Sequence, residues 1–308
     1  MKHTFFIAIA FLVLIVTALP AQNGIDPVKE AQNYITTTSG VRLYVKKAGK
    51  GPVCIFVHGG PGAWSKSFED LGGNKLEEQL SMIYLDQRGC GRSGNPADND
   101  YSLDSMVDDI EQVRQNLGTE KVYILSHSFG GILAVNYAAK YPQHVKGLIL
   151  ANSTLNLLYS VNGQTDYINS LLGTNFTASG PEDVFPTFIE ATKQLNEEGL
   201  GYKRLSDIEE NVKKVDSVDL TSPSTYQFAQ NALRIDAYLK DYTTITPNIS
   251  CPVLIITGKK DHAIGVDHYK AFKFPNQEVV SINGGHILYF ENNKAFVDAI
   301  FSFVDKTQ

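Results

Sequence analysis

The residue of this chain best placed to act as a nucleophile is Ser128, in the run Ser126-His127-Ser128-Phe129-Gly130-Gly131. An apolar stretch precedes the run and a helix-like stretch follows it. A strand that turns sharply into a helix with serine at the apex is a nucleophile elbow, in which small neighbours let strand and helix approach closely. The hydroxyl then lies at the helix N-terminus, where a base can reach it. The elbow pattern usually begins with glycine, and Ser126 takes that place here.

A serine nucleophile needs a base, and the base needs a carboxylate to orient it. Asp261 follows the apolar run 253–257 after a short turn, and His286 follows the run 278–282 in the same way. Both should therefore reach the carboxyl edge of a sheet, where Ser128 would lie. The chain order serine, aspartate, histidine is typical of such sites. A lone aspartate in a turn or a lone histidine is usually structural, but the joint order and spacing favour a triad of Ser128, Asp261 and His286.

A glycine-rich run, His58-Gly59-Gly60-Pro61-Gly62, comes directly after the apolar run 53–57. Acyl transfer places negative charge on an oxygen, which backbone N–H groups stabilise, and glycines let the backbone come close enough. The expected donors of this oxyanion hole are the amides of Gly60 and of Phe129, the residue after the serine. Such a run alone is an ordinary surface turn. The strand before it and the elbow after it favour the oxyanion role.

The remaining histidines fit catalysis less well. His127 should point into the elbow, and His58 should make structural hydrogen bonds in the glycine loop. His3 lies at the N-terminus and His144 on an expected loop. His262 is next to Asp261, and His268 lies in an expected helix. No set of histidine, cysteine and acidic residues has metal-ligand spacing, and no phosphate-binding loop opens a helix. We therefore expect no metal and no other cofactor.

The elements that must position these residues alternate between strand and helix. Apolar runs typical of strands buried on both faces follow a hairpin at 34–38 and 42–47. They occur at 53–57 and 82–85, and further strands are expected at 122–125, 145–150, 253–257 and 278–282. Helical periodicity covers 102–117, where Ser102 is the expected N-cap and Gly118 the end, and also 132–140 and 294–304. This alternation predicts an α/β fold, with a mostly parallel sheet and helices on both faces.

Between residues 152 and 246 the alternation disappears. The segments 181–195 and 223–240 favour helices. A helical insertion at this point would lie over the carboxyl ends of the strands, where such sheets bind ligands, and would form a cap. Aromatic segments around Tyr159, Tyr167 and Phe176 would either line an apolar pocket or pack the cap itself. The expected core therefore has two parts, 22–151 and 247–308.

The N-terminus is typical of a secretory signal peptide over residues 1–21. Lys2 precedes an apolar run over 5–19, and Ala18 and Ala21 are the possible cleavage points. This predicts export to the periplasm or beyond by a Sec-type signal, with no stable membrane span afterwards. An uncleaved N-terminal anchor is the alternative, although the run is shorter than the roughly 20 residues of a membrane span.

Charge and cysteine content exclude some partners. The formal net charge is −6 and no basic cluster occurs, so nucleic acid is not an expected partner, whereas a small molecule or short peptide is. The three cysteines, Cys54, Cys90 and Cys251, cannot all pair. We expect three free thiols packed as small apolar groups, with one disulfide as the alternative.

Two motifs resemble the proline iminopeptidase group of α/β-hydrolases: the glycine loop at 58–62 (HGGPG) and the run 86–93 (DQRGCGRS). The resemblance covers residues 34–151 and 247–305. It implies the α/β-hydrolase fold and removal of an N-terminal residue, typically proline, from small peptides by a serine mechanism. Considered without the family, the second motif is a glycine-rich turn after a buried strand, in which Arg88 or Arg92 ties loops together.

The chain departs from this group at two positions. The residue after the serine is commonly tryptophan and is Phe129 here, and His262 occupies a position after the triad aspartate that is often a carboxylate. The resemblance implies that carboxylates hold the substrate's amine, because a buried unpaired ammonium is costly. The insertion offers five candidates, Glu190, Glu197, Glu198, Glu209 and Glu210, although charges on such helices are mostly solvated.

The sequence thus predicts an exported serine hydrolase in which Ser128 attacks a carbonyl carbon, His286 carries the proton and Asp261 orients the imidazole. The expected substrate is a short peptide with N-terminal proline or a small apolar residue. An esterase or lactonase acting on small apolar esters would use the same machinery without an amine-binding carboxylate. A catalytically silent ligand-binding protein is the third possibility, and an intact triad argues against it.

Overall fold

The computed structural model describes residues 33–224 and 226–308, so the predicted signal peptide lies outside the described residues. Eight strands form one sheet in the order β1-β2-β4-β3-β5-β6-β7-β8. They are β1 (Tyr34–Thr36), β2 (Arg42–Ala48), β3 (Val53–Val57), β4 (Ser81–Leu85), β5 (Val122–Ser128), β6 (Val145–Ser153), β7 (Val253–Gly258) and β8 (Gln277–Ile282). The first two strands pair as the predicted hairpin, β2 is antiparallel to β4, and all neighbours from β4 to β8 are parallel. The mostly parallel sheet is confirmed.

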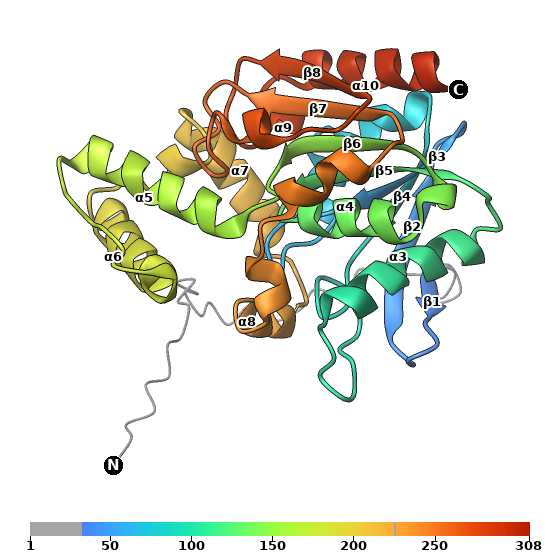
Figure 1. Ribbon diagram of the computed structural model, residues 1–308, viewed down its shortest axis with the longest axis horizontal. Helices are drawn as coiled ribbons and strands as arrows, with labels where there is room; N and C mark the ends of the chain where they lie inside the picture. Colours follow the sequence, from blue (N-terminus) through green and yellow to red (C-terminus); the bar gives the residue numbers. More distant parts are fainter. Residues whose placement is uncertain (1–32, 225) are drawn as a thin grey trace.

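Helices cover both faces of this sheet (Figure 1). One face packs against α3 (Leu103–Asn116) and α4 (Gly130–Lys140). The other packs against α2 (Lys66–Asp70), α9 (Leu288–Glu291) and α10 (Asn293–Thr307). Strand residues alternate between the two cores, since Ile55 belongs to the first and Phe56 to the second.

Local signals for α3 act as the sequence predicts. The Ser102 side chain accepts a hydrogen bond from the Ser105 amide, which caps the helix N-terminus. Gly118 has a φ of +63°, a left-handed conformation in which glycine carries no Cβ penalty, and the helix ends just before it. Both ends of the helix are thus set by single residues.

The insertion, defined here as residues 154–252 between β6 and β7, contains no strand among its described residues. It holds α5 (Leu157–Leu172), α6 (Val184–Glu197), α7 (Glu209–Asp219) and α8 (Gln227–Ala232). Figure 1 shows α5 and α6 extending away from the sheet. The four helices confirm the mostly helical composition, although the sequence did not resolve α5 or α7.

The helix expected over 223–240 is wrong in its extent. It is broken into α8 and a separate 3-10 helix, Asp236–Leu239. Tyr238 explains the break, because its ring is fully buried and its hydroxyl donates to the Tyr101 carbonyl at 2.7 Å. Docking this side chain into the core takes priority over continuing the helix.

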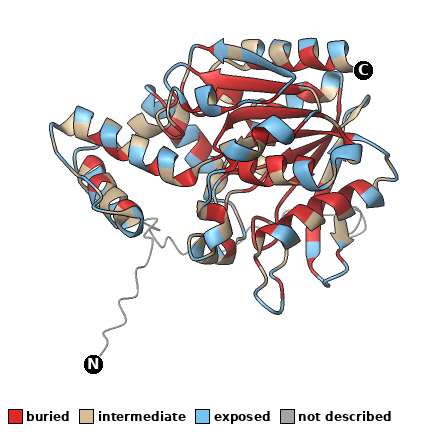
Figure 2. Ribbon diagram, viewed as in Figure 1, coloured by how far each residue is buried: buried red, intermediate tan, exposed pale blue. Residues whose placement is uncertain are grey.

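Burial separates the sheet from the insertion (Figure 2). The strands β3 to β7 are almost wholly buried, whereas the edge strand β8 is largely exposed. The helices α5 and α6 share only a small buried cluster of their own, Ile168, Ala191 and Leu195. All three cysteines are free, as expected, with Cys54 and Cys90 buried. Within the described residues, no helix combines the length and apolar character needed to cross a membrane.

Candidate active site

Ser128 lies at the last position of β5, immediately before the turn into α4. Its φ is +55°, a left-handed conformation that non-glycine residues rarely adopt and that is frequent at functional sites. A Cβ at Gly130 would lie 2.3 Å from the Val57 carbonyl oxygen, and one at Gly131 would lie 2.7 Å from the Ser153 Cβ. The turn therefore needs the small residues that follow the serine and has the geometry of the predicted elbow.

Asp261 and His286 form a hydrogen-bonded pair at the same edge of the sheet. The His286 Nδ1 atom lies 3.0 Å from Asp261 Oδ2 and 3.1 Å from Oδ1. The aspartate is fully buried and also accepts hydrogen bonds from the amides of Ala263 and Ile264. This fixed carboxylate orients the imidazole and leaves its Nε2 atom for proton transfer.

The structure brings the three residues of the predicted triad to one sheet edge, since each follows the carboxyl end of a parallel strand. Within the described residues, no hydrogen bond joins the Ser128 hydroxyl to the His286 ring. Catalytic hydrogen bonds of this kind are often long in ligand-free structures and tighten when substrate binds.

Asn152, which the sequence analysis did not single out, holds His286 in place. The side-chain amide of Asn152 donates to the carbonyls of Gly285 and His286, both at 2.9 Å, and its oxygen accepts from the Gly258 amide at 2.8 Å. The residue is buried and has a φ of +44°. Asn152 therefore ties the end of β6 to the loops that carry both Asp261 and His286, a role visible only once the strands are neighbours.

His127 supports the same loop from the elbow. Its Nε2 atom lies 2.9 Å from the His286 carbonyl oxygen, and its ring centroid lies 4.6 Å from that of His286. Burial, and secondarily the nearby His286 ring, lowers the pKa of His127 to about 3. The ring is thus neutral at ordinary pH and donates its Nε2 proton to the carbonyl. It does not compete with His286 as a base.

The glycine loop lies directly against the nucleophile. A Cβ at Gly59 would come within 2.6 Å of the Ser128 Cβ, so only glycine permits this approach. Gly60 follows with a φ of +121°. Phe129 is the N-cap residue of α4, and amides at a helix N-terminus have no partner within the helix. The structure therefore places Phe129 and the glycine loop that carries Gly60 beside Ser128.

The second motif braces this loop. Asp86 accepts hydrogen bonds from the Ser65 amide at 2.9 Å and from Arg92 Nε at 2.7 Å. Burial raises the pKa of Asp86, but its hydrogen bonds and charge interaction with Arg92 bring that pKa below its usual range. Gln87 contacts His58 twice, through its amide to the ring Nε2 and through its side chain to the carbonyl. Arg92 therefore ties loops together, as expected.

The insertion contacts both loops of the triad. The His286 amide donates to the Leu205 carbonyl at 2.7 Å. On the other loop, the Gln164 side chain donates to the Ala263 carbonyl at 2.8 Å, and Tyr167 stacks on His262 with ring centroids 3.5 Å apart. The aromatic residue Tyr167 thus packs the insertion onto the loop of Asp261.

The five glutamates expected to bind an amine all lie at exposed positions of α6, the turn after it and α7. Glu209 pairs with Lys213 at 3.0 Å. None of the five has a hydrogen bond or ion pair with a triad residue among the described residues. Asp219, at the end of α7, is a carboxylate that the sequence analysis missed. It accepts hydrogen bonds from Trp64 Nε1 at 2.8 Å and Ser67 Oγ at 2.6 Å.

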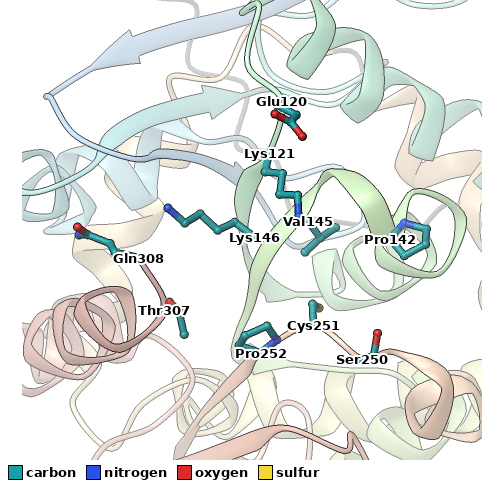
Figure 3. A pocket seen from close by; sticks show the side chains of 10 residues that line it. All are labelled: Glu120, Lys121, Pro142, Val145, Lys146, Ser250, Cys251, Pro252, Thr307 and Gln308. Atoms are coloured by element: carbon teal, nitrogen blue, oxygen red, sulfur yellow. The ribbon is translucent and has the colours of Figure 1, made fainter.

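A hollow of about 620 Å³ lies at the other edge of the sheet (Figure 3). Lys121, Val145 and Pro252 line it at the amino ends of β5, β6 and β7, together with the C-terminal Thr307 and Gln308. It is therefore separate from the triad. In the described part of the chain, no group of three or more histidine, cysteine and acidic side chains is arranged to hold a metal ion.

Comparisons with known proteins agree with this geometry. The profile of the family described as alpha/beta hydrolase fold matches residues 52–293. The chain is 28% identical over 284 residues to a proline iminopeptidase of Saccharolobus solfataricus, covering 87% of this chain and 90% of that protein. A proline iminopeptidase of Heyndrickxia coagulans is 27% identical, and the alignment covers 89% of this chain and 98% of that protein.

Among solved structures, a proline iminopeptidase-related protein from Thermus thermophilus superposes with a TM-score of 0.73 at 21% identity. The alignment covers 89% of this chain and 96% of that one, and supports the fold alone. The chain therefore belongs to the α/β-hydrolase fold family and is related to the proline iminopeptidases.

Proposed function

We propose that this protein is a serine hydrolase that works through an acyl-enzyme. The observation that carries the proposal is the buried Asp261–His286 pair, at the sheet edge where Ser128 occupies a left-handed elbow. The glycine loop packed against that serine supports an oxyanion role. A silent ligand-binding protein would have no need to keep this arrangement.

The proposed reaction has two halves, formation of the acyl-enzyme and its hydrolysis, and the same groups act in both. The Ser128 oxygen bonds to the substrate's carbonyl carbon while its proton passes to His286 Nε2. The amides of Gly60 and Phe129 stabilise the oxyanion. The imidazolium, held by Asp261, gives the proton to the leaving group as its bond to carbon breaks. Water then attacks the acyl-enzyme with His286 again as the base, and the acid product leaves.

Short peptides with N-terminal proline or a small apolar residue are the proposed substrates. The names of the related proteins support this choice. Asp219 is our candidate for the group that holds the substrate's amine, since its neighbour Trp64 follows the glycine loop in sequence. Burial raises the pKa of Asp219, and no ion pair neutralises its carboxylate among the described residues. The ammonium group of a substrate would supply the positive charge that this carboxylate lacks.

Esters or lactones are the second candidate class. The observation that favours them is the exposed position of all five candidate glutamates, together with the stacking of His262 on Tyr167 where a carboxylate was expected. An ester needs no partner for an amine. In both cases the insertion would act as a cap over the strand ends, and residues 1–21 would direct export.

A substrate panel tests these proposals. The protein would be assayed on proline, alanine and leucine anilides and on short and long nitrophenyl esters, with Asp219→Asn in parallel. The aminopeptidase proposal predicts anilide cleavage that N-acetylation of the substrate abolishes, and a higher KM in Asp219→Asn. Ester cleavage without anilide turnover would reject it in favour of the second class. No turnover of either would favour a binding protein.

A further inference from the structure

Arg204, in the insertion, is a cationic side chain without an anionic partner among the described residues. Its guanidinium donates one hydrogen bond, to the neutral Gln164 side chain at 3.2 Å, and lies 5.5 Å from the Phe188 ring centroid. Its Nε atom is buried and has no hydrogen-bond partner within the described chain. The positive charge of Arg204 is therefore left uncompensated by the protein around it.

Three arginines of the core are arranged differently. Arg88, Arg92 and Arg114 each have a carboxylate within 2.7 Å, namely Asp109, Asp86 and Glu111. An arginine removed from water without such a partner is costly, and burial lowers the pKa of Arg204. The residue as a whole is of intermediate exposure, so it is not sealed from solvent. A carboxylate would complete the hydrogen bonding that the protein leaves open.

The position of Arg204 connects this uncompensated cation to the triad. The next residue, Leu205, accepts the hydrogen bond of the His286 amide. Gln164, which contacts Arg204, donates to the carbonyl of Ala263 in the loop of Asp261. Arg204 therefore lies in the part of the insertion that bridges the two loops carrying the base and its aspartate.

We propose that Arg204 binds the carboxylate of the substrate while the substrate's carbonyl lies at Ser128. Guanidinium matches a carboxylate through two parallel hydrogen bonds, which gives both affinity and orientation. The ligand class is a small carboxylic acid. On the proposed aminopeptidase function, on which this detail rests, it is a di- or tripeptide with a free C-terminus. Asp219 and Arg204 would then hold its two opposite charges.

Two matched substrate pairs test the proposal. The first is Pro-Ala against Pro-Ala amide, and the second is the 4-nitrophenyl monoester of glutaric acid against 4-nitrophenyl pentanoate. In the class that is turned over, wild type should favour the acid by roughly 10- to 100-fold in kcat/KM, as expected for a charge-assisted pair. Arg204→Gln should bring this ratio close to one, and Arg204→Lys should lie between.

Arg234→Gln is the control, because it removes a positive charge from an exposed position of the same insertion. It should keep the acid preference. Thermal unfolding separates recognition from a structural role: Arg204→Gln should melt no lower than wild type, since it removes an uncompensated charge. A wild-type ratio near one, an unchanged ratio in Arg204→Gln, or a clearly lower melting temperature would overturn the proposal.

If neither pair is turned over, the proposed function fails. Titration calorimetry then tests separately whether Arg204 binds a carboxylate. Binding of Pro-Ala or glutarate to wild type that is lost in Arg204→Gln would support the carboxylate site. Equal binding to both proteins, or no binding to wild type, would contradict it.

Discussion

Arg88 and Arg204 illustrate how the core and the insertion differ. Arg88 is 2% exposed and binds Asp109 through two hydrogen bonds of 2.7 Å each. Arg204 has a single bond to a neutral amide. The core neutralises its buried charges internally, which fixes its loops. Among the described residues, the insertion leaves a cation and the carboxylate of Asp219 without partners of opposite charge, as expected of a surface that binds a ligand.

Packing shows the same contrast. The core has two large apolar clusters on either face of the sheet, whereas the insertion has only a three-residue cluster of its own. In the described chain, all but one of the large exposed apolar residues belong to the insertion: Tyr159, Ile189, Ile208, Leu220 and Tyr226. The insertion therefore relies for most of its buried apolar contacts on the core cluster, which Val161, Phe228 and Tyr238 join.

The largest effect on activity is expected from removal of the proposed nucleophile in the core. Ser128→Ala should lower kcat by roughly 10⁴- to 10⁶-fold on any substrate that wild type cleaves. Ser126→Ala is the matched control, because the buried Ser126 hydroxyl contacts Ser153 and Ile149 and no triad residue. Steady-state kinetics would show activity near wild type for the control. Similar losses in both variants would mean that the elbow, and not its hydroxyl, matters.

The orienting carboxylate comes next in size. Asp261→Asn should lower kcat by about 10⁴-fold, because an amide no longer stabilises the correct imidazole tautomer and its charged form. Circular dichroism would verify the fold. A folded variant with more than a tenth of wild-type kcat would remove Asp261 from the mechanism.

Stability measurements on the two arginines sharpen the contrast. Asp109→Asn leaves Arg88 buried without its partner and should cost roughly 3–5 kcal/mol of unfolding free energy in urea titrations. In the insertion, Arg204→Gln removes a cation that has no such partner and should cost nothing. Equal losses in the two variants would show that both arginines are structural.

A substitution of Asn152 tests whether the core holds His286 in position. Asn152→Ala removes the side chain that joins the loops of Asp261 and His286. A small misplacement of the imidazole should lower kcat by about 10²-fold. The acid preference assigned to Arg204 should remain. A variant with wild-type kcat would show that His127 alone suffices to hold the loop.

Acid should lower the free energy of unfolding, because His127 is buried as a neutral ring. Its pKa of about 3 in the folded protein lies below the value near 6.5 in the unfolded chain. Between these values the unfolded state binds more protons, so the free energy of unfolding falls as the pH is lowered below 6.5, by up to about 1.4 kcal/mol per pH unit. His127→Asn should flatten this part of the profile. An unchanged slope would contradict the buried neutral ring. The insertion contains no histidine and so makes no contribution of this kind.

Local patterns predicted the core well. The elbow around Ser128, the cap at Ser102 and the strand ends before Asp261 and His286 depend on near neighbours in the chain. The insertion was predicted less well, since α5 and α7 carry many polar residues and Tyr238 interrupts the helix expected over 223–240. The contacts of Asn152, Asp219 and Arg204 could not be predicted, because each is made with residues distant in the sequence.

The convergence of Ser128, Asp261 and His286 is tested most directly by covalent labelling with a fluorophosphonate, followed by peptide mass spectrometry. The account predicts one phosphonyl group on the peptide that contains Ser128. It also predicts that the labelling rate falls by orders of magnitude in His286→Ala. Labelling at another residue, or an equal rate in the histidine variant, would contradict it.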